Sequence, residues 1–115
     1  MMELVKTIAD GLAQEEGLVF FPEDCETIAV NCVHVKQGQI TEPAVHPDEE
    51  EVYVITGGEG IVYLDKVPNA VAPGKIIYIP RHVEHIIEGV GPDGVTYVCV
   101  ANWPDQPAKK SMIKE

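Results

Sequence analysis

Long apolar runs are missing from this sequence of 115 residues. The longest, such as Leu18–Phe21 and Ile76–Ile79, fall far short of the roughly 20 residues that a membrane-spanning helix needs. The chain begins Met-Met-Glu and shows neither the basic nor the apolar segment of a secretory signal peptide. We therefore expect a cytoplasmic protein with no membrane partner.

Basic residues are also scarce. Lys and Arg number 8 against 19 Asp and Glu, which gives a formal net charge of −11 at pH 7. Proteins that bind nucleic acid or anionic membranes need basic surfaces that neutralise phosphates. The composition therefore argues against both partners, and the charge is explained first by solubility.

Cysteine is the third scarce residue. Cys25, Cys32 and Cys99 are an odd number without a C-x-x-C pair, so we expect no disulfide framework. Cys32 and Cys99 lie within apolar runs, where cysteine behaves as a small buried hydrophobe. The sequence carries no signal that any of the three is catalytic.

The length of the chain and the rest of its composition fit a single domain, residues 1–115. Apolar residues make up 45% of the chain and charged residues 23%, as in an ordinary globular protein with one core. We find no linker and no internal repeat that would divide the chain.

Short β-rich runs separated by Gly, Pro and Asp fill the chain after residue 17. The predicted strands are Thr27–Lys36, Glu51–Thr56, Gly60–Leu64, Lys75–Ile79, His85–Glu88 and Val95–Ala101. Gly57–Glu59 is typical of a hairpin turn, and Val67–Gly74, with two prolines, of a loop. A Gly-Pro-Asp-Gly turn starts at Gly91. Such a series favours an all-β sandwich or barrel.

Residues 3–14 are the one segment with a helical period. Leu4, Ile8 and Leu12 recur at every fourth position before Gly17, which favours a short N-terminal helix. A strand that pairs across a dimer is an equally good interpretation of this segment.

Candidate ligands for a metal ion surround a predicted turn. His46 closes one strand, Pro47–Glu49 has the chemistry of a type I turn, and Glu51 opens the returning strand. A His and a Glu placed in this way are neighbours across an antiparallel pair. His85 starts a later strand, and closure of the sheet into a barrel would bring all three side chains together inside it.

The same residues follow the pattern of a known family. Residues 38–58 resemble the first cupin motif, G-x5-H-x-H-x(3,4)-E-x6-G, and residues 74–89 resemble the second, G-x5-P-x-G-x2-H-x3-N. The positions that match are Gly38, His46, Glu51, Gly58, Gly74, Pro80 and His85. The resemblance implies a double-stranded β-helix, or jelly-roll barrel, with its core at about residues 27–101. It also implies one divalent metal per chain, which in this family is usually iron, manganese, nickel or zinc.

Three positions depart from these motifs. Ala44 stands where the family has its first metal-binding His, His82 replaces the second Gly, and Gly89 replaces the terminal Asn. The implied ligand set is therefore reduced to His46, Glu51 and His85.

Several neighbouring polar residues compete with this set or extend it. Glu50 is a rival ligand by spacing, but Glu51 directly precedes the strand Val-Tyr-Val-Ile and is preferred. His34 is a possible fourth ligand, which strand alternation does not decide. We interpret His82 as a turn residue and Asp48–Glu50 as a solvated acidic turn.

In the predicted strand that begins at Glu51, successive side chains should point alternately into and out of the barrel. Tyr53 shares the face of Glu51, so it points into the barrel as a core residue or, second, as a substrate contact with a catalytic role. Val52 and Val54 point outward and need a cover, which is either a partner in a homodimer or another part of the chain. Trp103, after the last strand, is interpreted as a packing anchor.

Two His and one carboxylate suit non-haem Fe(II) with open coordination positions. The first hypothesis is a metal-dependent protein that acts on a small organic molecule, in its sharpest form a dioxygenase. An isomerase or epimerase of a sugar or sugar acid is the second hypothesis. A non-catalytic module that binds or senses a metabolite is the third. The fold alone does not separate them.

Overall fold

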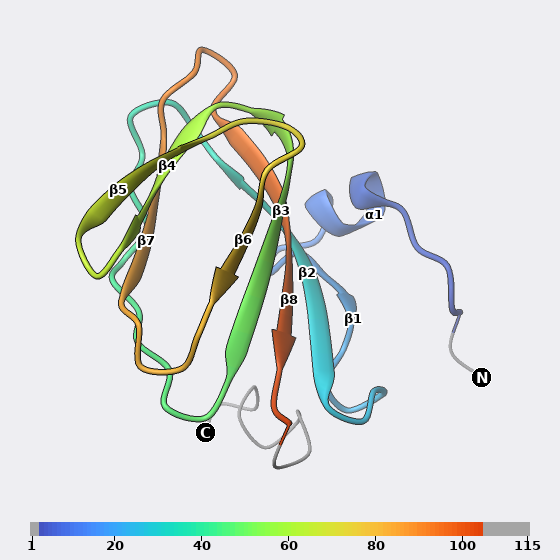
Figure 1. The fold of residues 1–115 in the computed structure, drawn as a ribbon. Helices are drawn as coiled ribbons and strands as arrows, with labels where there is room; N and C mark the ends of the chain where they lie inside the picture. Colours follow the sequence, from blue (N-terminus) through green and yellow to red (C-terminus); the bar gives the residue numbers. More distant parts are fainter. Residues whose placement is uncertain (1–2, 105–115) are drawn as a thin grey trace.

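The structure is a computed structural model that describes residues 3–104 (Figure 1). One helix and eight strands follow in the order α1 (Ile8–Leu12), β1 (Leu18–Phe20), β2 (Ile28–Val35), β3 (Glu50–Gly58), β4 (Gly60–Leu64), β5 (Val67–Val71), β6 (Ile76–Ile79), β7 (His85–Gly89) and β8 (Val95–Asn102). The prediction of an all-β fold is confirmed. Over residues 3–104, no helix is long and apolar enough to span a membrane.

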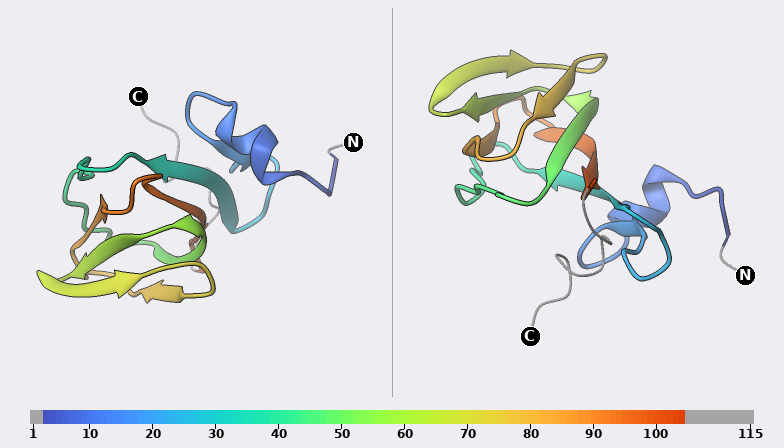
Figure 2. Two further views of the ribbon diagram at one scale, coloured as in Figure 1. Left: turned by 90° about the horizontal axis from the view of Figure 1, so that it is seen from above. Right: turned by 60° about the horizontal axis from the view of Figure 1, so that its bottom comes forward.

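The strands form two antiparallel sheets that face each other (Figures 1 and 2). The larger sheet has the order β1-β2-β8-β3-β6, and the smaller has the order β5-β4-β7. Residues 37–44 run beside β7 and bridge to it at three points, which closes one side of the barrel. Every pair of neighbouring strands is antiparallel.

The core lies between the two sheets. Alternate residues of β3 and β8 point inward and are buried, as the period-two pattern of a half-exposed sheet requires. They join side chains of the facing strands in one cluster: Val35, Tyr53, Ile55, Val62, Val71, Ile77, Ile79, Ile87, Val95, Tyr97 and Cys99. Burying each large apolar side chain of this kind contributes about 1.5–3 kcal/mol.

Trp103 anchors a second, smaller cluster. Its side chain is fully buried against Leu18, Ala29 and Ala101. Its backbone N–H donates a hydrogen bond to the carbonyl of Thr27 at 2.8 Å. The interpretation of Trp103 as a packing residue is confirmed.

The N-terminal segment is a helix, and it is shorter than the sequence pattern. α1 spans Ile8–Leu12, and the hydroxyl of Thr7 caps it by accepting a hydrogen bond from the N–H of Asp10 at 3.0 Å. Gly11 lies against Cys32 of β2, at a distance that leaves no room for a larger side chain. The helix therefore covers one end of the larger sheet.

The predicted loop at Val67–Gly74 is wrong, because Val67–Val71 forms β5. This strand pairs with β4 and lies at the edge of the smaller sheet. Pro68 has no N–H to donate, but an edge strand tolerates that loss on its unpaired side. Pro68 therefore marks an edge strand, and only Pro73 lies in the loop that follows it.

The predicted hairpin at Gly57–Glu59 is also wrong. β3 runs on to Gly58 in the larger sheet, and β4 begins at Gly60 in the smaller sheet. Gly58 has a φ of 71°, and a Cβ there would overlap the carbonyl oxygen of Gly94. The glycines therefore allow the chain to cross between the sheets. The short strand β1 was not predicted at all.

His46 does not close a strand, and it does not pair with Glu51. It lies in an irregular loop between Ala44, which forms an isolated bridge to His85, and β3. Two backbone hydrogen bonds of 2.9 and 3.2 Å join Ala44 and His85. The three predicted ligands therefore come together through this bridge and the loop, rather than through a tight hairpin.

His82 has a left-handed backbone with a φ of 71°, at the position where the motif has a glycine. Its N–H donates a hydrogen bond to the carbonyl of His46 at 2.9 Å. This contact links the turn before β7 to the loop that carries His46. The glycine of the motif is thus a backbone requirement, which His82 meets at a cost.

We predict that His82→Gly is more stable than His82→Val by about 2 kcal/mol. Glycine adopts this backbone freely, whereas a β-branched residue is strained by it. Chemical denaturation of both variants, with circular dichroism as the readout, measures the difference. Equal stability of the two variants would contradict the argument.

Candidate metal centre

His46, Glu51 and His85 meet inside the barrel. One ligand atom from each residue lies within 4.8 Å of the other two. Glu51 belongs to β3 in the larger sheet, His85 begins β7 in the smaller sheet, and His46 lies in the loop before β3. The site therefore joins the two sheets at one end of the barrel.

Glu51 is the most central of the three residues. Its Oε1 atom lies 3.0 Å from Nε2 of His85 and 4.0 Å from Nε2 of His46. Within residues 3–104 this buried oxygen accepts no hydrogen bond of regular geometry. An oxygen placed in this way between two imidazoles has the surroundings of a metal ligand.

Two contacts hold His85 in place: the backbone bridge to Ala44 and a contact of its Nδ1 ring nitrogen. The Nδ1 atom lies 3.2 Å from the carbonyl oxygen of Val83. A carbonyl only accepts, so Nδ1 is the nitrogen that carries the proton in this contact. The Nε2 atom is then directed at Glu51, which is the arrangement of a histidine ligand oriented by an outer partner.

His46 is more open than His85. Its ring lies 5.2 Å from the ring of His85 between centroids, and its Nε2 atom lies 3.5 Å from Oε2 of Glu49. Because His82 holds the carbonyl of His46, the backbone of this loop is fixed while the imidazole reaches the pocket.

Glu51 and His85 stabilise each other's charged forms. Burial alone would raise the pKa of Glu51, but the contact with His85 outweighs burial and lowers that pKa below its usual value. Burial alone would lower the pKa of His85, but Glu51 and the carbonyl of Val83 raise it above its usual value. Both shifts favour a protonated imidazole beside an ionised carboxylate, so an ion that binds Nε2 of His85 would release a proton from this imidazole.

Three neighbouring residues do not join the site. Glu50 points to the outer face, where it accepts hydrogen bonds from Tyr78 at 2.7 Å and from Asn102 at 3.0 Å. His34 is exposed on that same face of the sheet and bonds the hydroxyl of Thr96 at 2.8 Å. His82 is exposed in its turn. The preference for Glu51 over Glu50 agrees with this geometry, and His34 is not a fourth ligand.

Glu49 is a residue that the sequence interpretation placed wrongly. It was assigned to a solvated turn, but only 7% of its surface is exposed, and its carboxylate faces His46. Strand alternation already carried the signal, because Glu49, Glu51 and Tyr53 are two residues apart. The inward-facing positions of β3 therefore include Glu49, one residue before the strand begins.

Cys99 was predicted to be buried, and it is, but its contact with the site was not foreseen. Its Sγ atom lies 3.4 Å from Oε2 of Glu51, to which the thiol donates a hydrogen bond. Burial, with the neighbouring carboxylate, raises the pKa of Cys99 far above its usual range, so the thiol keeps its proton. The contact arises because Tyr53 pairs with Cys99 across β3 and β8.

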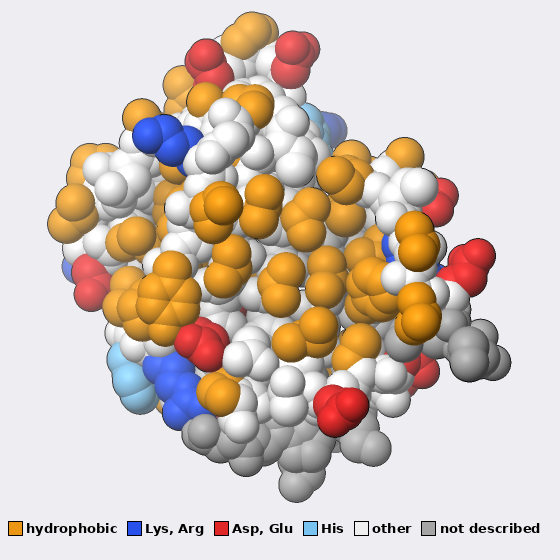
Figure 3. Space-filling model, turned by 45° about the vertical axis from the view of Figure 1, so that its right-hand side comes forward, with side chains coloured by type: hydrophobic (Ala, Val, Ile, Leu, Met, Phe, Trp, Pro, Cys, Tyr) orange, Lys and Arg blue, Asp and Glu red, His pale blue; other side chains and the backbone are white. Residues whose placement is uncertain are grey.

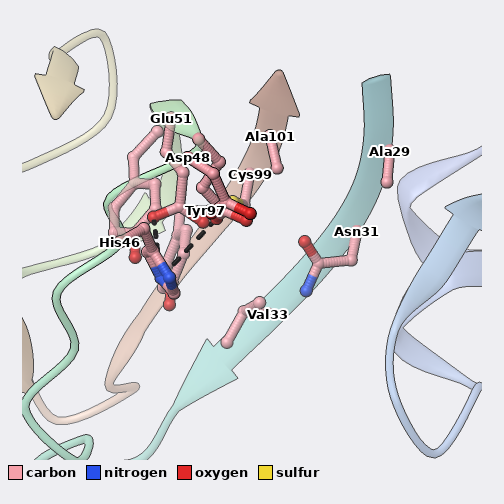
Figure 4. A pocket seen from close by; sticks show the side chains of 11 residues that line it. Ala29, Asn31, Val33, His46, Asp48, Glu51, Tyr97, Cys99 and Ala101 are labelled. Carbon is pink, nitrogen blue, oxygen red and sulfur yellow. Dashed lines mark hydrogen bonds and ion pairs between the residues drawn. The ribbon is translucent and has the colours of Figure 1, made fainter. Parts of the chain in front are cut away.

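A pocket of about 370 Å³ adjoins His46 and Glu51 (Figure 4). It is lined by Ala29, Asn31, Val33, His46, Asp48, Glu49, Glu51, Tyr53, Tyr97, Cys99 and Ala101. Small side chains of β2 form the wall opposite His46 and Glu51 (Figure 4). The size falls in the range of small-molecule sites.

Tyr53 also lines this pocket. Its ring stacks on Tyr97 with centroids 4.4 Å apart and meets His85 edge-on at 6.2 Å. Burial raises the pKa of Tyr53 well above its usual range, so the phenol stays protonated. Tyr53 is thus a core residue that also lines the pocket, and its catalytic role stays a prediction.

Solved structures of other proteins share this fold. An uncharacterized conserved protein with a double-stranded β-helix domain from Klebsiella pneumoniae superposes with a TM-score of 0.79 at 15% identity, over 90% of this chain and 93% of that one. The DMSP lyase DddQ from Ruegeria pomeroyi has a TM-score of 0.61 at 20% identity, over 68% of this chain and 39% of that one. The predicted jelly-roll architecture is confirmed.

Sequence comparison identifies the family. An uncharacterized protein of Methanocaldococcus jannaschii is 36% identical over 59 residues, which are 51% of this chain and 47% of that protein. The chain thus matches about half the length of this relative. The family model described as the cupin domain matches residues 31–101, which include both motifs. This chain therefore belongs to the cupin family.

Proposed function

We propose that this cupin holds one divalent transition metal through His46, Glu51 and His85. The observation that carries the proposal is the convergence of two imidazoles on the buried Oε1 atom of Glu51, which lacks a regular hydrogen bond within the described residues. Two His and one carboxylate suit Fe(II) and leave coordination positions open. Manganese, nickel and zinc are the other candidates.

The pocket beside these residues supports the proposal that the ligand or substrate is a small organic molecule. Its described lining contains the carboxylates of Asp48 and Glu49 and no lysine or arginine. A dicarboxylate would meet charges of its own sign there. A neutral or basic molecule with hydroxyl or amine groups is better matched to this lining.

A dioxygenase reaction is the activity that the ligand set favours. When bound, the ion would supply Lewis acidity and the activation of O₂. Glu49 lies beside His46 on the pocket side, where its carboxylate can accept a hydrogen bond from a substrate hydroxyl and orient it. Tyr53 and Tyr97, whose rings stack with centroids 4.4 Å apart, also line the pocket and give it an aromatic surface.

Two other hypotheses stay open to test. An isomerase or epimerase needs a group that moves a proton, and Glu49 provides a second carboxylate in the pocket for that task. A binding or sensing module needs only the ligand set and the apolar wall. The DMSP lyase of similar fold is an enzyme, but a likeness at 20% identity does not transfer its reaction.

We predict that His46→Ala and His85→Ala each weaken metal binding more than about 100-fold, because even changes to residues that merely orient a ligand cost about 10- to 100-fold. Competition with a chelator and mass spectrometry of the purified protein measure the effect. His34→Ala is the matched control, since His34 lies on the outer face and should keep wild-type binding. Equal metal content in all four proteins would refute the assignment.

Oxygen consumption separates the functional hypotheses. Protein loaded with Fe(II) should consume O₂ together with a catechol, an amino alcohol or a polyol from a small panel, and His46→Ala should not. Isomerisation of a sugar without O₂ uptake would favour the second hypothesis. Ligand-dependent quenching of the single Trp without turnover would favour the binding module.

We predict that Ala44→His tightens metal binding by about tenfold or more. Ala44 faces His85 directly across an antiparallel bridge, so the two side chains leave the backbone on the same face. An imidazole at this position adds a fourth protein ligand. Chelator competition measures the gain, and unchanged affinity in a folded variant would show that the side chain at 44 does not reach the ion.

A further inference from the structure

The two oxygens of the Glu51 carboxylate have different neighbours. Oε1 lies 3.0 Å from Nε2 of His85 and 4.0 Å from Nε2 of His46. Oε2 accepts a hydrogen bond from the thiol of Cys99, with Sγ at 3.4 Å. The two imidazoles thus lie nearest to one oxygen, and the thiol lies on the other.

Cys99 reaches Glu51 from the neighbouring strand. Cys99 of β8 pairs with Tyr53, which is two residues beyond Glu51 on the inner face of β3. Its sulfur lies beside the carboxylate in the wall of the pocket (Figure 4). Hydrophobic side chains gather on the outer face of this sheet (Figure 3), whereas the polar contact lies on the inner face. The register of the two strands therefore places a neutral donor against Glu51.

Glu49 approaches the same carboxylate from the loop before β3. Its side chain is buried, and its Oε2 atom lies 3.5 Å from Nε2 of His46. Burial raises the pKa of Glu51, and hydrogen bonds from His85 and Glu49 are among the contacts that lower it. A hydrogen bond between two carboxyl groups contains one proton, and the lowered pKa identifies Glu51 as the acceptor. Glu49 and Cys99 therefore both donate to Glu51.

The two donors differ in what an ion at the proposed site would do to them. Glu49 faces Nε2 of His46, which is also the nitrogen nearest to Glu51 and so the one available to an ion. Ligands lose their protons when they bind a metal, so the proton between the two carboxyl groups is not retained beside an ion. The thiol of Cys99 lies on Oε2, and its contact depends on neither imidazole.

We propose that Cys99 is the positioning residue of Glu51 in the metal-loaded protein, and that Glu49 shares this task only until an ion binds. The inference rests on the proposed metal site. A carboxylate whose second oxygen is held by a donor presents one oxygen to an ion, and outer contacts of this kind change metal affinity by about 10- to 100-fold. Release from Glu51 also leaves the carboxylate of Glu49 available to a molecule in the pocket.

Co(II) binding to four proteins tests the role of the thiol. Cys99→Ala should lower Co(II) affinity by about 10-fold or more, whereas Cys99→Ser, which keeps a donor, should stay within about threefold of the wild type. Cys32→Ala is the matched control, because Cys32 is also buried but lies on the opposite face of the larger sheet, against α1. The visible spectrum of Co(II) should change in Cys99→Ala and be restored in Cys99→Ser. Circular dichroism checks that each variant is folded.

A double-mutant cycle with Glu49→Ala tests the exchange between the two donors. Affinity compares the protein with and without the ion. Without the ion, Glu49 still holds Glu51 when the thiol is removed, so Cys99→Ala acts mainly on the loaded protein and affinity falls. In a Glu49→Ala background the thiol is needed in both states, so Cys99→Ala should lower Co(II) affinity by less than about threefold.

The outcomes separate this inference from the metal site itself. A wild type that binds no Co(II) would refute the site and the inference with it. Wild-type affinity and spectrum in Cys99→Ala would refute the positioning role and leave the site intact. An equal loss from Cys99→Ala in both backgrounds would overturn the exchange between Glu49 and Cys99. A sulfur-to-cobalt absorption band in the wild type, lost in Cys99→Ala, would make Cys99 a direct ligand and would equally overturn the role inferred here.

Discussion

The carboxylate of Glu51 is buried in the barrel, and this burial constrains everything around it. A charged group without water is costly unless neighbouring groups offset the lost hydration. His85 lies against one oxygen and the thiol of Cys99 donates to the other. His85 belongs to the smaller sheet and Cys99 to the larger, so the carboxylate is compensated only where the two sheets meet.

Strand alternation explains what the sequence could predict. Along β3, Glu51 and Tyr53 point inward while Val52 and Val54 point outward, as the period of two requires. The spacing of the two motifs also pointed to His46 and His85, although His46 lies in a loop and does not close a strand as predicted. These features depend on short stretches of chain, and short stretches are what a sequence pattern describes.

Features that depend on pairing between distant strands were missed or misplaced. The contact of Cys99 with Glu51 follows from the register of β3 against β8, which no local pattern specifies. β5 was taken for a loop because Pro68, and Pro73 just after the strand, look like turn residues until the edge position of β5 is known. Glu49 was misplaced for a different reason, since the inward alternation of β3 continues into the loop before it.

The origin of the three ligand atoms in two different sheets has a consequence for how the protein folds. β2 and β3 both pair with β8, the last strand, so the chain has to close long loops before these contacts form. His46 and Glu51 are near each other in the sequence, but His85 reaches them only once β7 has docked. An ion at the proposed site would therefore not serve as a template for this barrel. It would meet a finished cavity, and a closed fold rather than a folding chain would choose among competing metals.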